Sequence, residues 1–187
     1  MKRLLLLVPL GLALNVAIFV LSPYREIAAA LAPMQPFEAS PTESLRKTTE
    51  RLGLLDDTGR AQYVAMQGWD VGAILGNAMI LLPLLLAGAT FAGVPRRLRG
   101  LVLIAGALPL ALDLLENAFV LTLLRAVPLT ESICTNAALA TTAKWMAFFG
   151  AAGLIVVLWL AALLKRLRAG AARASGTPTD DLQRGRP

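Results

Sequence analysis

Three polar side chains lie close together inside one of the most apolar stretches of the chain. Residues 109–124 read PLALDLLENAFVLTLL and include Asp113, Glu116 and Asn117. Positions i, i+3 and i+4 share one face of a helix, so the two carboxylates and the amide should point the same way. Closely spaced carboxylates suit general acid/base chemistry or the binding of a polar group. Ionisable side chains are costly inside a membrane, and we therefore treat this face as a candidate functional site.

The composition places this segment in a membrane protein. Of 187 residues, 57% are hydrophobic and 16% are charged, whereas soluble domains have about a quarter of their residues charged. The hydrophobic residues gather in blocks that are long enough to cross about 30 Å of hydrocarbon as helices. The predicted fold class is all-α, a polytopic bundle of four transmembrane helices. These spans are expected over residues 4–21, 71–94, 98–124 and 140–164.

The distribution of Lys and Arg predicts the direction of each span. Basic residues lie near the amino terminus, between the second and third spans, and after the fourth, which would put all three segments in the cytoplasm. The net charge of +6 comes from residues that flank the spans, so nucleic acid is not an expected partner. The membrane domain would cover residues 1–168, with both termini cytoplasmic. The tail, residues 169–187, has a composition that predicts disorder.

Two features near the first span have alternatives. Residues 4–21 could be a cleaved signal peptide, but the length of the apolar run favours an uncleaved helix. The connection over residues 23–70 is too long for a turn and is expected to hold one or two short extracytoplasmic helices. Residues 40–43 (SPTE) match a capping box for a helix that ends at Gly53. Asp57 would cap a second segment over residues 58–67.

The residue types exclude several kinds of site. The chain contains no His and one Cys, which rules out metal sites built from those ligands and triads with an imidazole base. No Gly-rich phosphate loop with its lysine is present. We therefore expect neither a metal nor another cofactor.

Helical rise puts further polar residues at a depth similar to that of the two carboxylates. Lys144 is the cation nearest in depth, and its alternative is to extend to the outer interface beside Trp145. Asn77 and Asn117 suit interhelical hydrogen bonds. The residues expected in the outer half of the membrane, with Asp113 at its inner limit, are Asn77, Asp113, Glu116, Asn117 and Lys144.

The pattern formed by several of these residues, together with others in the outer connection, resembles that of a group of small bacterial four-helix integral membrane proteins. The matching elements are Gly59-Arg60-x-x-Tyr63, Asp70, Asp113-Leu-Leu-Glu116-Asn117 and Thr142-x-Lys144-Trp145. The resemblance covers most of residues 50–165, and DLLEN in the third span is its most specific part. It implies a bacterial inner membrane protein without implying a reaction. It also implies that Arg60, Tyr63 and Asp70 form the lid side of the carboxylate site.

Three functions are consistent with these features. The favoured one is binding of a small hydrophobic molecule or membrane lipid in an outward-facing polar pocket, without catalysis. The second is an enzyme that transfers protons on a lipid or isoprenoid, with Glu116 and Asp113 as candidate catalytic residues. The third is a structural or accessory subunit, and Gly72-x-x-x-Gly76 is a weak indication of a homo-oligomer. The expected ligand-binding residues are Arg60, Tyr63, Asp70, Asn77, Asp113, Glu116, Asn117 and Lys144.

Overall fold

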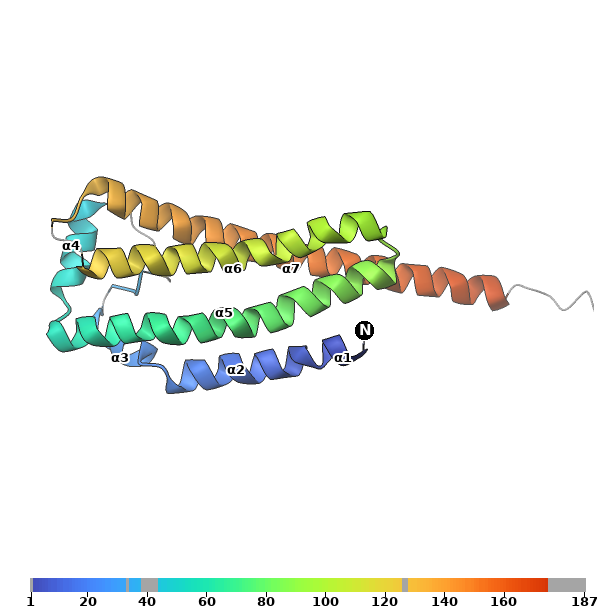
Figure 1. Cartoon of the computed structure of the whole chain (residues 1–187), viewed down its shortest axis with the longest axis horizontal. Coiled ribbons are helices and arrows are strands. Elements are labelled where there is room, and N and C mark those ends of the chain that lie inside the picture. Colours follow the sequence, from blue (N-terminus) through green and yellow to red (C-terminus); the bar gives the residue numbers. More distant parts are fainter. Residues whose placement is uncertain (1, 33, 38–43, 126–127, 175–187) are drawn as a thin grey trace, which may run out of the picture.

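The computed structural model of the chain describes residues 2–32, 34–37, 44–125 and 128–174. Within them, four helical segments are long and apolar enough to cross a membrane, and no strand is present (Figure 1). The prediction of an all-helical protein with four candidate spans is therefore confirmed. The first span comprises α1 (Lys2–Leu5) and α2 (Leu7–Leu21). The others are α5 (Asp57–Ala92), α6 (Arg96–Arg125) and α7 (Glu131–Ala174).

Helix α5 is the central element, because it packs against α2, α6 and α7. Glycines bring α2 and α5 close together. A Cβ atom at Gly11 would lie 2.5 Å from the carbonyl oxygen of Gly76, and one at Gly72 would lie 2.8 Å from Ile18 Cδ1. The glycine pair that indicated a homo-oligomer thus packs against α2 of the same chain.

Helix α5 also corrects the predicted organisation of the outer connection. We expected a separate segment over residues 58–67, capped by Asp57, before a span that begins at Val71. Instead α5 is continuous, and its N-cap is Asp56, whose side chain accepts a 2.7 Å hydrogen bond from the Gly59 amide. A glycine inside a helix costs only about 1 kcal/mol. Burial of the apolar Met66 side chain, two residues before Gly68, offsets part of that cost.

Two shorter helices and the ends of three long ones form a hydrophobic core at one end of the molecule. Helix α3 covers Tyr24–Ala30 and α4 covers Leu45–Gly53. The N-cap of α4 is Ser44, and the proposed capping box at residues 40–43 lies outside the described residues. We call this end the cap. Its core consists of Ile27, Leu31, Phe37, Leu52, Leu55, Tyr63, Met66, Val120, Leu123, Leu124, Cys134 and Ala137.

The opposite end of the molecule holds the amino terminus, the α5–α6 turn and the last turns of α7 (Figure 1). We call it the basic end, because Arg96, Arg97, Lys165 and Arg166 all lie there. Helix α7 continues to Ala174, so the first residues of the predicted disordered tail are helical. The rest of that tail lies outside the described residues.

Candidate functional site

A buried ion cluster joins α6 to α7. Lys144 Nζ donates a hydrogen bond to Glu116 Oε2 and lies 3.2 Å from Asp113 Oδ1. The three residues are 6%, 0% and 5% exposed in the order Lys144, Glu116, Asp113. The i, i+3 spacing directs both carboxylates toward the one ammonium group. Of the two alternatives left open for Lys144, the structure shows the pairing with the carboxylates.

The charges of this cluster do not balance. Burying a charge in a low-dielectric interior costs several kcal/mol, and a close partner of opposite sign offsets that cost. One ammonium group faces two carboxylates, so the cluster has an excess of acceptor oxygens. Such a site favours a further hydrogen-bond donor or a positive charge nearby.

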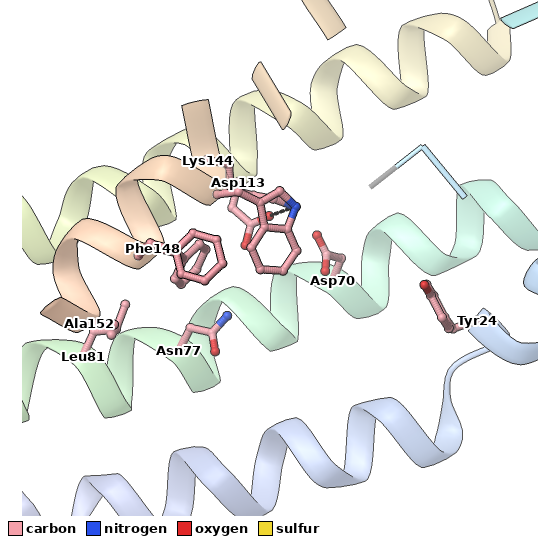
Figure 2. Close-up of a pocket in the computed structure, with 10 residues that line it drawn as sticks. Tyr24, Asp70, Asn77, Leu81, Asp113, Lys144, Phe148 and Ala152 are labelled. Carbon is pink, nitrogen blue, oxygen red and sulfur yellow. Dashed lines mark ion pairs between the residues drawn. The ribbon is translucent and has the colours of Figure 1, made fainter. Parts of the chain in front are cut away.

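Two members of the cluster, Asp113 and Lys144, line a pocket of about 510 Å³ (Figure 2). That volume lies within the range of about 300–1,000 Å³ that is typical of small-molecule sites. In Figure 2, Asp70 and Tyr24 lie on the cap side of the ion cluster, whereas Leu81, Phe148 and Ala152 lie on the other side. The pocket therefore has Asp70 and the Tyr24 hydroxyl toward the cap, and mainly apolar side chains together with Asn77 toward the basic end. Its lining consists of Tyr24, Asp70, Asn77, Leu81, Asp113, Lys144, Trp145, Phe148, Phe149 and Ala152.

Helix α5 provides two polar residues of the lining. Asp70 Oδ2 is buried and accepts no hydrogen bond from the residues that the structure describes. Asn77 Oδ1 accepts a 2.9 Å hydrogen bond from Asn15 Nδ2, which is the interhelical role expected of it. A neighbouring pocket of about 500 Å³ between α2 and α5 shares Tyr24, Asp70 and Asn77 with the first. These three residues thus form the boundary between two hollows.

Aromatic residues of α7 form the wall that the sequence analysis missed. Trp145, Phe148, Phe149 and Ala152 follow the i, i+3, i+4, i+7 pattern of one helical face. Trp145 is 45% exposed and Phe149 is 70% exposed. Part of this wall therefore faces the outside of the molecule. The helical spacing of these residues was the available signal, but we had interpreted Trp145 only as an interfacial residue.

Arg60 and Tyr63, which we expected on the lid side of the carboxylates, lie in the cap instead. The Arg60 guanidinium donates a 3.1 Å hydrogen bond to the carbonyl oxygen of Leu52. The Tyr63 hydroxyl accepts a 2.9 Å hydrogen bond from the backbone amide of Phe37. Because α5 is continuous, Tyr63 lies about 10 Å closer than Asp70 to the amino-terminal end of the helix, in the direction of the cap. Both residues hold the connection between α2 and α5 in place and do not line the pocket.

Glu116 and Asn117 are placed behind the pocket. Neither belongs to its lining, and both are buried. Neither polar atom of the Asn117 amide has a hydrogen-bond partner among the described residues, so the interhelical bond expected for Asn117 is not seen there. Of the eight expected ligand-binding residues, the pocket brings together Asp70, Asn77, Asp113 and Lys144.

The described part of the chain contains no group of three side chains able to hold a metal ion. Fold and site thus define an all-helical protein with four candidate membrane spans and a buried ion cluster beside a pocket. No protein-family model matches the chain, and no match was found among curated proteins or solved structures. The resemblance to small bacterial four-helix membrane proteins therefore stays a prediction.

Proposed function

We propose that the protein is a four-helix bundle of the bacterial inner membrane that binds a small hydrophobic molecule or lipid. Both termini would lie in the cytoplasm and the pocket in the outer half of the membrane. One observation carries the proposal. Asp113 and Lys144, which are buried and form an ion pair, line a pocket whose other side is formed by Leu81, Phe148 and Ala152.

The polar side of the pocket favours a particular kind of head group. Ionised carboxylates accept hydrogen bonds and cannot donate them. Asp113 shares its only described partner, Lys144, with Glu116, and Asp70 has an oxygen without a bond. A hydrogen bond to a charged group contributes about 1.5–3 kcal/mol. The expected ligand therefore carries a hydroxyl, amide or ammonium head and an apolar tail that lies along Phe148.

The other two functions have less support. An enzyme that uses Glu116 as its acid or base needs that side chain to reach the bound molecule, and Glu116 has no exposed surface. A homo-oligomer through Gly72 and Gly76 would use the face of α5 that already packs against α2 of the same chain, so this face is not available to a second copy. We therefore retain binding as the proposed function, with Asp70 and Asp113 as the residues that contact the head group.

The tryptophans provide a direct test. Only Trp145 lines the pocket, so a variant with Trp69→Phe and Trp159→Phe reports on it alone. This variant, in lipid nanodiscs, would be titrated with dodecylamine, dodecanol and dodecanoate. We expect a saturable change in Trp145 emission with the first two and a much weaker change with dodecanoate, which has no donor at neutral pH. Mass spectrometry of the detergent-purified protein would search for a retained lipid.

Matched substitutions on α5 separate the pocket from general charge effects. Asp70→Asn should weaken dodecylamine binding by about tenfold, which corresponds to the loss of one charged hydrogen bond. Asp57→Asn changes the net charge equally in the exposed first turn of α5 and should leave binding unchanged. The absence of saturable binding by all three probes, with no retained lipid, would overturn the proposal.

A further inference from the structure

We infer that the basic end of the molecule has a second lipid site, which takes an anionic phospholipid with its acyl chain in a groove on α7. This groove has a volume of about 470 Å³ and shares no residue with the pocket beside the ion cluster. Every lining side chain is apolar or aromatic except one, the guanidinium of Arg166. The lining consists of Phe91, Ile155, Val156, Trp159, Leu160, Ala162, Leu163 and Arg166.

Aromatic contacts hold Arg166 at one end of the groove. Its guanidinium carbon lies 5.3 Å from the centre of the Phe91 ring, within cation–π distance. The edge of that ring packs against Trp159 with centroids 5.7 Å apart. Trp159 Nε1 in turn donates a 3.2 Å hydrogen bond to the carbonyl oxygen of Leu84. Phe91 and the Trp159 hydrogen bond thus hold the Arg166 side of the groove against α5.

Arg166 has no carboxylate partner in the described part of the chain, and none is near in sequence. Residues 71–112 and 132–174 contain no Asp or Glu. They include the whole α5–α6 turn and the part of α7 that forms the groove. Within the described residues, no carboxylate therefore neutralises the positive charge at this end.

The neighbouring cations lie within reach of the same turn. Lys165 Nζ lies 2.7 Å from the position that a Cβ atom on Gly93 would occupy, which places this ammonium against the carboxyl end of α5. Arg99 Nε donates a 3.0 Å hydrogen bond to the carbonyl oxygen of Val94. Arg96 and Arg97 are exposed on the first turn of α6. Arg166 therefore lines the groove among several cations that have no carboxylate partner in the part of the chain that the structure describes.

The combination of groove and charge favours a phospholipid over other anions. A soluble anion would not contact the seven apolar lining residues favourably, and an uncharged lipid would leave the charge of Arg166 without a partner. A guanidinium binds phosphate oxygens in pairs, and its weak hydration suits a site at the edge of the bilayer. Each basic residue near an anionic surface contributes about 1 kcal/mol. A net negative phospholipid fits both parts of the site.

Trp159 reports on this groove. A variant with Trp69→Phe and Trp145→Phe would be placed in nanodiscs that contain a small fraction of brominated phosphatidylglycerol or brominated phosphatidylcholine. Bromine quenches a nearby indole, so quenching measures which lipid occupies the groove. We expect the anionic lipid to give half-maximal quenching of Trp159 at a mole fraction about fivefold lower. Equal quenching by the two lipids would overturn the inference.

Two substitutions distinguish a site from general attraction to a basic surface. Arg166→Gln and Arg168→Gln remove the same charge from exposed positions of α7, but only Arg166 lines the groove. We expect Arg166→Gln to abolish most of the preference and Arg168→Gln to keep it. Equal losses would show that surface charge alone attracts the lipid and would overturn the inference. Arg166→Lys retains the charge and should keep part of the preference, which separates lost binding from lost folding.

Discussion

Lys144 donates a hydrogen bond to Glu116 across two antiparallel helices whose side chains lean in opposite directions. Side chains tilt toward the amino terminus of their own helix. Glu116 on α6 and Lys144 on α7 therefore lean in opposite directions along the axis, and the long lysine side chain reaches the carboxylate of Glu116. The same ammonium also reaches Asp113, at 3.2 Å. One flexible side chain thus neutralises part of the charge on a neighbouring helix.

The first prediction concerns the stability that this lysine provides. Lys144→Met leaves Asp113 and Glu116 buried without a cation and should lower the free energy of unfolding by about 3–5 kcal/mol. Unfolding of the purified protein by sodium dodecyl sulfate would measure the change. Lys47→Met, on the exposed side of α4, is the control and should have almost no effect. Similar values for the two variants would show that the buried pair does not stabilise the fold.

The second prediction concerns the close contact between α2 and α5. Gly11→Ala places a methyl group 2.5 Å from the carbonyl oxygen of Gly76, so the helices must move apart. We expect a loss of about 1–3 kcal/mol, as for other overpacked contacts. Gly100→Ala on α6 meets no atom within 4 Å and should stabilise the protein slightly through helix propensity. Thermal unfolding in detergent would compare them, and an unaffected Gly11→Ala would argue against this packing.

The third prediction concerns the length of the ligand. Ala152→Leu fills the apolar side of the pocket and should weaken binding of long-chain amines more than that of short-chain amines. A profile of Trp145 emission from hexylamine to hexadecylamine would give the result. Ala161→Leu lies elsewhere on α7, outside both pockets lined by that helix, and should leave the profile unchanged. If Ala152→Leu reduced binding of every chain length equally, the tail would not lie beside Ala152.

The fourth prediction tests the placement of Tyr63. Tyr63→Phe removes the acceptor of the Phe37 amide and should increase its hydrogen exchange, with a loss of about 1 kcal/mol in local stability. Dodecylamine binding should stay unchanged, because Tyr63 does not line the pocket. Exchange followed by mass spectrometry of peptides that contain Phe37 would measure the first effect. A large loss of binding with normal exchange would return Tyr63 to the ligand site.

The four candidate spans and the shared face of Asp113 and Glu116 could be predicted from sequence because they depend on local properties. The apolar blocks are longer than ordinary core helices, and the i, i+3 spacing fixes which side chains share a face. The contact with Lys144 was harder to predict. It depends on the axial offset between α6 and α7, which the sequence of either helix alone does not contain.

The misplaced residues share one physical cause. Arg60 and Tyr63 were assigned to the lid because the resemblance implied it, and because the outer connection was expected to hold short helices separate from the second span. Helix α5 is continuous through Met66 and Gln67, which are buried, and Arg60 and Tyr63 therefore lie in the cap. Two of the three residues expected on the lid side thus lie away from the pocket, and only Asp70 lines it.

The described residues of the basic end include no Asp or Glu, which has a consequence in an energised membrane. Moving one positive charge across a potential of 100 mV changes the free energy by about 2.3 kcal/mol. All eight acidic residues of the described segments lie in the cap, in the cap-side connections or beside the pocket. The described part of the molecule is therefore polarised along its long axis. In the proposed orientation, with the basic end in the cytoplasm, a membrane potential that is negative inside would favour that orientation over the inverted one.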